Sequence, residues 1–207
     1  MSKKASKSKG VPSGSSKGLY PTIAISDAFN ALMHLLAAYF AFQGSNYVGM
    51  IGYFTVALAA TVGVLRFGFN EDRYALANSN LADMAAFVGL PCVGYSFSMT
   101  LPFIKELPIH SLVLAVSLMM VEALSRSFPP LYRHLMKVFV TLFFFVAPVT
   151  ISSILRRRWW TFGAILLFVI AGLVVKPLRH EYLLGIRREN IFHYLIGVAS
   201  YVIALDE

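Results

Sequence analysis

Seven apolar stretches occupy most of this 207-residue chain. A helix needs about 20 mainly apolar residues to cross a hydrocarbon layer about 30 Å thick. With 57% hydrophobic and 14% charged residues, the chain has too little polar surface to cover a water-soluble domain of its size. We therefore interpret the stretches as membrane spans: Thr22–Phe42, Tyr47–Phe67, Leu81–Thr100, Leu107–Leu124, Leu131–Leu155, Trp159–Val175 and Asn190–Leu205.

The predicted fold is an all-α, polytopic membrane helical bundle with seven transmembrane helices. Backbone polar groups in lipid must be satisfied within a helix or around a closed barrel. The segments show no sustained alternation of polar and apolar residues, and their number is odd, so we favour helices. The bundle is expected to comprise residues 20–207. Residues 1–19 form a basic tail rich in lysine, serine and glycine, a composition that predicts disorder.

The distribution of Lys and Arg predicts the orientation, because basic loops are retained in the cytoplasm. We therefore place the amino terminus in the cytoplasm and the carboxyl terminus on the other side. If Leu107–Leu124 failed to span, the later segments would invert and the charge difference would shrink. The predicted cytoplasmic residues are Lys3, Lys4, Lys7, Lys9, Lys17, Arg66, Arg73, Arg126, Arg133, Lys176, Arg179, Arg187 and Arg188, and those opposite are Lys105, Arg156, Arg157 and Arg158.

One basic cluster opposes this topology, because it places three arginines on the non-cytoplasmic face. It is either an interfacial anchor, with tryptophan rings at headgroup level, or a specific site for an anionic lipid or a partner, or a sign of wrong topology. The connection Lys176–Glu189 is expected to lie flat on the membrane or to be a linker with a short helix. The candidate headgroup-binding residues are Arg156, Arg157, Arg158, Trp159, Trp160, Arg179, Arg187 and Arg188.

Ionisable groups within spans each cost about 2.5 to 3.5 kcal/mol unless they find a partner or water. Asp27, Asn30 and His34 recur at helical spacing and form one predicted polar stripe. Glu122 and Lys137 flank the same loop at equal distances, which predicts a salt bridge between them. Asp83 is expected near the first turn of its span, where it would offset the helix dipole. The candidate polar-pocket residues are Asp27, Asn30, His34, Asp83, Glu122, His134, Lys137 and His193.

Under the predicted topology these polar residues share the cytoplasmic third of the bundle, and only His34 lies deeper. Either they line a water-filled pocket open to the cytoplasm, or each pairs across a helix interface or reaches the nearby surface. Glycines in several spans favour close helix packing and thus the second interpretation. Pro91 and Pro148 are predicted to kink their spans.

The sequence carries no catalytic, metal or cofactor signature. The five histidines include no His-x-x-x-His pair, so no metal site is predicted. The chain has no Gly-x-Ser-x-Gly elbow, because its one match to that pattern, residues 14–18, lies in the basic tail predicted to be disordered. The last span has no lysine for a retinal Schiff base. No cofactor is expected. The net charge of +8 lies in the tail and membrane-flanking loops, which favours anionic lipid headgroups over nucleic acid as partners.

Three function classes remain open. The favoured hypothesis is a non-enzymatic scaffold, assembly or regulatory component of a membrane complex, because the loops are short and other membrane proteins would be the partners. The second is a small-solute or ion transporter or channel with a cytoplasm-facing polar pocket. The third is an intramembrane lipid-modifying enzyme in which Asp27 orients His34 or another histidine as a general base. The expected location is the endoplasmic reticulum or another endomembrane.

Overall fold

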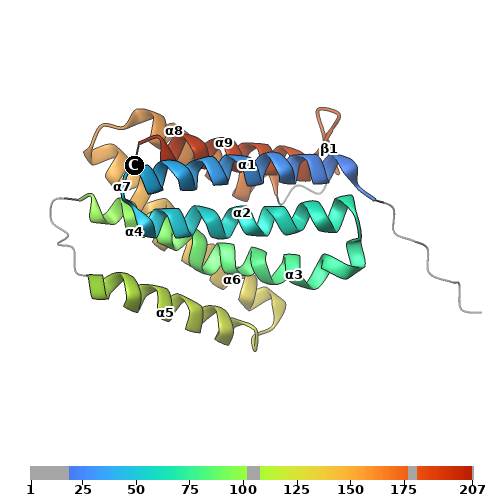
Figure 1. Cartoon of the computed structure of the whole chain (residues 1–207), viewed down its shortest axis with the longest axis horizontal. Helices are drawn as coiled ribbons and strands as arrows, with labels where there is room; N and C mark the ends of the chain where they lie inside the picture. The colour runs from blue at the N-terminus through green and yellow to red at the C-terminus, as the bar shows by residue number, and fades with distance from the viewer. Residues whose placement is uncertain (1–18, 102–107, 177–180, 207) are drawn as a thin grey trace, which may run out of the picture.

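The structure is a computed structural model that describes residues 19–101, 108–176 and 181–206, with the side chains of residues 108–116 excepted. The described chain is a helical bundle, so the predicted all-α class is confirmed (Figure 1). The predicted tail and the predicted contact residue Arg179 lie outside the described residues. The helices are α1 (Pro21–Gln43), α2 (Tyr47–Gly68), α3 (Glu71–Met84), α4 (Leu90–Met99), α5 (Pro108–Ser125), α6 (Pro130–Thr141), α7 (Ala147–Leu155), α8 (Trp159–Ile170) and α9 (Arg188–Ala204).

Three π-helical segments continue the α-helices: η1 (Ala85–Gly89) joins α3 to α4, η2 (Leu142–Val146) joins α6 to α7, and η3 (Ala171–Val175) extends α8. Each of them ends two positions before a proline in the sequence, Pro91, Pro148 or Pro177. The ring of a proline clashes with the carbonyl four residues earlier, and a wider π turn relieves that clash. Phe87 and Phe144, which are four residues before Pro91 and Pro148, lie in η1 and η2.

Four of the continuous helices are long and apolar enough to cross a membrane: Pro21–Gln43, Tyr47–Gly68, Glu71–Met99 and Pro130–Leu155. They cover the first, second, third and fifth predicted spans, which identifies the chain as a membrane protein. The other three predicted spans coincide with α5, with the shorter apolar helix Trp159–Val175, and with α9. The seven-span topology therefore stays a prediction.

The third helix begins ten residues earlier than the sequence predicted, at Glu71 instead of Leu81. The side chain of Asn70 caps it by accepting a hydrogen bond from the backbone N–H of Arg73 at 2.9 Å. Asp83 consequently lies near the end of α3 and is only 3% exposed. Its predicted role as a first-turn residue is wrong.

The connection before α9 also differs from prediction. Its described part is a short antiparallel hairpin of β1 (Tyr182–Leu183) and β2 (Ile186–Arg187), and not a helix. Leu184 and Gly185 form the turn with φ angles of 53° and 77°. Two successive positive φ angles suit the right-handed twist of a two-residue hairpin, and glycine adopts such an angle without a steric cost.

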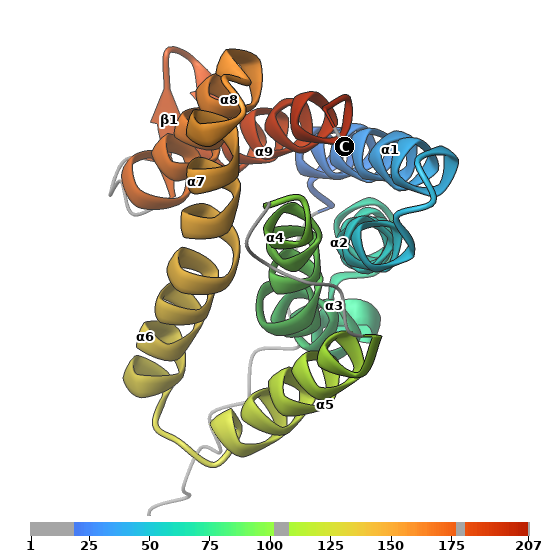
Figure 2. The same cartoon turned by 90° about the vertical axis from the view of Figure 1, so that its left-hand side faces the viewer.

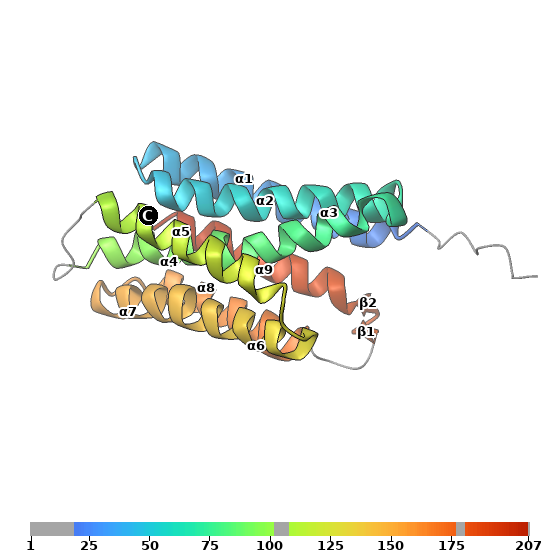
Figure 3. The same ribbon diagram turned by 90° about the horizontal axis from the view of Figure 1, so that it is seen from below.

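Six helices form a closed ring in the order α1, α2, α4, α7, α8 and α9, and α5 lies outside it against η1 (Figure 2). We call the end at which α1, α3, α6 and α9 begin the proximal end, and the opposite end, with the α7–α8 turn, the distal end. Figure 3 shows the hairpin at the proximal end. The Arg156–Arg158 turn and the α1 amino terminus therefore lie at opposite ends of the bundle (Figure 1).

The main apolar core lies toward the distal end. It joins small residues of α1 and α9 to larger side chains of α4, α7 and α8, such as Phe97, Val149 and Ile165. Glycines let the helices approach closely there. A Cβ atom added to Gly94 would lie 1.9 Å from the carbonyl oxygen of Phe144. The outer faces expose Leu32, Phe54, Phe143 and other large apolar residues, as expected where lipid is the solvent.

Candidate functional site

A cavity of about 600 Å³ lies within the proximal half of the ring, between α1, α2, α3, α6, η3 and α9. Its chemistry changes along the bundle axis. The deeper wall is apolar and includes Val56, Leu90, Val146, Phe168 and Ile196. The polar residues gather toward the proximal end: Asp27, Asn30, Asn78, His134, Lys137, Thr141, Lys176, Arg188, Glu189 and His193.

One wall of the cavity carries a polar cluster between α1 and α9. His193 Nδ1 lies 2.9 Å from Asp27 Oδ1 and 3.2 Å from Ser26 Oγ. The Ser26 hydroxyl donates to the carbonyl oxygen of Ile23 at 2.9 Å and lies 3.2 Å from Asn190 Oδ1. Asp27 is 4% exposed. Because the carboxylate accepts at Nδ1, the neutral imidazole would carry its proton on that nitrogen and its lone pair on Nε2.

The other two residues of the predicted α1 stripe are buried, and each has one side-chain polar atom without a hydrogen-bond partner among the described residues. Asn30 lines the cavity, and its Oδ1 has no hydrogen-bond partner among the described residues. His34 is fully buried below the cavity, where Nδ1 donates to the Asn30 carbonyl at 2.9 Å. Its Nε2 likewise has no partner in the described chain. The stripe thus faces the interior, but only its upper part reaches the cavity.

An ion-pair network lies behind the opposite wall, and of its members only Lys137 lines the cavity. Asp83 pairs with both Arg133 and Lys137. Glu122 pairs with Arg126 at 2.9 Å and with Arg133 at 3.7 Å. The predicted Glu122–Lys137 salt bridge is therefore wrong. The reason is helix packing, because the junction of α3 and η1 packs against both α5 and α6 and presents Asp83 to Lys137.

Lys176 at the end of η3 is a lining residue that the sequence analysis left out of the pocket. It lines the cavity at the proximal mouth, and its Nζ lies 5.1 Å from the centre of the Phe192 ring. Burial of the ammonium by surrounding helix ends, and then the charge of Lys137, lower the pKa of Lys176. Its position at the end of a predicted span was a signal, but flanking lysines are also common anchors.

The candidate headgroup-binding residues do not form one site. Arg156 lies at the distal end and donates to the Thr100 carbonyl, and Arg157, Arg158 and the exposed Trp159 and Trp160 adjoin it. At the proximal end, Arg187 stacks on the ring of Tyr20 at 4.9 Å and pairs with Glu181 at 3.2 Å. Of the candidates that the structure describes, Arg188 alone lines the cavity, and it pairs with Glu189 at 2.9 Å.

The structure thus brings Asp27, Asn30, His134, Lys137 and His193 to one cavity, together with Lys176 and Arg188. Asp83 and Glu122 do not line the cavity, and of the two only Asp83 pairs with a lining cation, Lys137. No group of three or more metal-ligating side chains occurs among the described residues. The site therefore offers cations, a carboxylate-oriented imidazole and an unpaired amide oxygen above an apolar chamber.

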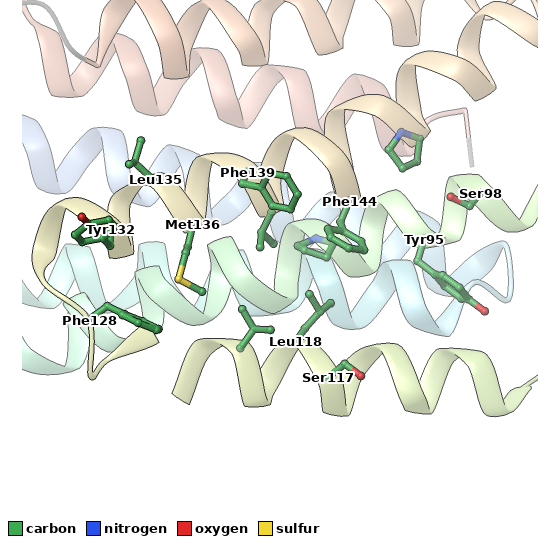
Figure 4. A pocket seen from close by; sticks show the side chains of 14 residues that line it. Tyr95, Ser98, Ser117, Leu118, Phe128, Tyr132, Leu135, Met136, Phe139 and Phe144 are labelled. Carbon is green, nitrogen blue, oxygen red and sulfur yellow. The ribbon is translucent and has the colours of Figure 1, made fainter. Parts of the chain in front are cut away.

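A second hollow, a groove of about 990 Å³, lies outside the ring between α4, α5 and α6. Figure 4 shows Leu118 of α5 facing the side chains of Met136 and Phe144 across it. Its lining is almost wholly apolar, apart from two serines and the tyrosine hydroxyls. The groove can receive an acyl chain or an apolar helix.

Comparison with protein-family models, with curated proteins and with solved structures finds no significant match. The function is therefore argued from the cavity itself.

Proposed function

We propose that this protein binds one amphipathic lipid molecule inside the helical ring, with the headgroup at the proximal end. The observation that carries the proposal is the division of the cavity into a polar mouth and an apolar chamber. A volume of about 600 Å³ falls within the range of roughly 300 to 1,000 Å³ typical of small-molecule sites. A freely soluble ion or polar solute would leave the apolar wall unused.

The positive-inside prediction places the proximal end in the cytoplasm, and the bound lipid would then come from the cytoplasmic leaflet. The proximal surface supports an approach by lipid. The hairpin exposes Tyr182, Leu184 and Ile186 beside the arginines at positions 187 and 188. Apolar side chains interleaved with arginines favour contact with the headgroup layer.

Filling the cavity is expected to abolish lipid binding. Gly172 lines the cavity, and a Cβ added there meets no atom within 4 Å, so Gly172→Trp can project into the chamber without displacing backbone. Gly163 on the same helix is equally unobstructed but does not line the cavity, which makes Gly163→Trp the matched control. Native mass spectrometry of the purified proteins should show one retained lipid for the wild type and Gly163→Trp, and none for Gly172→Trp. Equal retention by both variants would contradict the proposal.

A lipid-modifying enzyme is the second candidate, favoured by the Asp27–His193 pair at 2.9 Å. A histidine whose Nδ1 proton is held by a carboxylate presents Nε2 as a general base. In an ester hydrolysis, Nε2 would take a proton from water, the resulting hydroxide would attack the acyl carbon, and the departing alkoxide would recover the proton.

His193→Gln separates catalysis from binding. General-base catalysis typically contributes about 10² to 10⁴-fold in rate, so the variant is expected to lose lipid turnover by at least about 100-fold while retaining a bound lipid. Chromatography with mass detection of a lipid mixture incubated with each protein measures the products. A wild type that forms no product from any lipid it binds would remove this second candidate.

The scaffold hypothesis keeps one supporting observation, the apolar groove between α4, α5 and α6. An apolar partner helix would fit such a surface by van der Waals packing alone. Lipid binding in the ring and assembly through the groove use different faces of the bundle, so the two functions are compatible.

A further inference from the structure

The mouth of the cavity holds more cations than its carboxylates can neutralise. Lys137, Lys176 and Arg188 line it from three different helices, against the two carboxylates of Asp27 and Glu189. The adjoining network does not reverse this balance, because Asp83 and Glu122 there meet Arg126, Arg133 and Lys137. The electrostatics of the mouth therefore favour an anion.

Lys176 is the cation of this group that lacks a counter-charge. Lys137 pairs with Asp83, and Arg188 pairs with Glu189. No carboxylate lies within salt-bridge distance of Lys176 among the described residues, and the nearest aromatic contact is the Phe192 ring at 5.1 Å. A lysine that is not paired with a carboxylate can meet an anionic ligand without first breaking an ion pair.

A second polar feature lies below these cations. Asn30 is 5% exposed, lines the cavity and leaves its Oδ1 without a donor among the described residues. A buried acceptor without a partner is destabilising, and a donor on a ligand would remove that cost. A ligand that carries both an anionic group and a nearby hydroxyl would satisfy the cations and the Asn30 acceptor. A phosphate ester of a polyol carries both groups.

We propose that the cavity mouth is a phosphate site, in which Lys176, Lys137 and Arg188 bind a phosphate monoester and Asn30 accepts a hydrogen bond from an adjacent hydroxyl. This inference rests on the proposed lipid binding and names the headgroup class. Three cations from separate helices suit a tetrahedral dianion better than a single carboxylate. The phosphate belongs either to a lipid or to a free phosphate compound, and the experiment separates these sources. Phosphatidate, the lipid probe, carries the phosphate monoester but no free hydroxyl, so it tests the three cations and not the Asn30 contact.

The test measures the affinity of the full-length protein for three probes: phosphatidate, phosphatidylcholine and inorganic phosphate. Lys176→Gln removes the unpaired charge at similar size, and Lys176→Arg restores it. Arg73→Gln is the matched control, because Arg73 is exposed at the proximal end and does not line the cavity. Loss of one charge-assisted hydrogen bond is expected to weaken phosphatidate binding by roughly tenfold or more in Lys176→Gln.

The inference predicts that the wild type prefers phosphatidate to phosphatidylcholine, that Lys176→Arg keeps this preference, and that Arg73→Gln stays within about twofold of the wild type. Binding of inorganic phosphate with the same loss in Lys176→Gln, but without phosphatidate binding, would support the site and identify a free phosphate as its source. Equal binding of both lipids with no effect of Lys176→Gln would overturn the phosphate site and leave lipid binding intact. A wild type that binds none of the three probes would overturn both.

Discussion

Gly94→Val is expected to prevent stable folding, with the largest effect of any single substitution considered for this bundle. A Cβ at this position would lie 1.9 Å from the carbonyl oxygen of Phe144 and 2.7 Å from the Cα of Phe145. Both are backbone atoms, so no side-chain rotation can relieve the clash, and the α4–η2 contact would have to separate. Overpacking typically costs about 1 to 3 kcal/mol when side chains can adjust. We expect at least about 4 kcal/mol here, because the backbone must move.

The measurement is thermal unfolding of the detergent-solubilised protein, followed by size-exclusion chromatography. A loss of this size corresponds to a fall in Tm of roughly 10 °C or more for a chain of this length. Gly163→Val is the control, because a Cβ added at Gly163 meets nothing within 4 Å. A Gly94→Val protein that unfolds at the temperature of the control would show that α4 and η2 do not pack as described.

Asp83→Asn is expected to have the second-largest effect. Asp83 is 3% exposed and neutralises both Arg133 and Lys137, whose side chains are 25% and 31% exposed. Breaking a fully buried ion pair costs about 3 to 5 kcal/mol. Because the two cations reach solvent in part, screening reduces this figure, and we expect about 2 to 3 kcal/mol.

A double-mutant cycle in the same unfolding assay tests the origin of that loss. Removing Lys137 as well, in Asp83→Asn with Lys137→Gln, should cost less than the sum of the single changes. Glu181→Gln breaks the pair between Arg187 and the 61% exposed Glu181, and we expect a cost below about 1 kcal/mol. The network would be refuted if the stability losses of the two single variants simply added up in the double variant. It would also be refuted if Asp83→Asn lost no more stability than Glu181→Gln.

The sequence predicted the helical fold well because length and hydropathy decide it. Trp159–Val175 was predicted with the observed limits, and Tyr47 was predicted as the observed start of α2. The start of the third helix was predicted too late, because the segment Glu71 to Asn80 is polar. Hydropathy detects only the part of a helix that faces lipid. The hairpin was missed because a two-residue turn at Leu184-Gly185 lacks the usual Asn-Gly signal.

The candidate site was predictable in its members but not in its pairings. Helical spacing indicated that Asp27 and Asn30 share one face, and shared depth brought in His134 and His193. Pairing depends on which helices are neighbours, and the sequence does not contain that information directly. For that reason Lys137 pairs with Asp83 and not with Glu122. Asp27 likewise pairs with His193 of the last helix and not with His34 of its own helix.

Photocrosslinking tests the central claim, lipid binding within the ring, most directly. Phosphatidate with a diazirine near the middle of one acyl chain would be incorporated in nanodiscs with the wild-type protein, irradiated, and mapped by peptide mass spectrometry. We expect crosslinks at inward residues such as Leu142 and Phe168, which line the cavity. Crosslinks confined to outward residues such as Phe143 and Ile170, which are 59% and 45% exposed, would contradict the account.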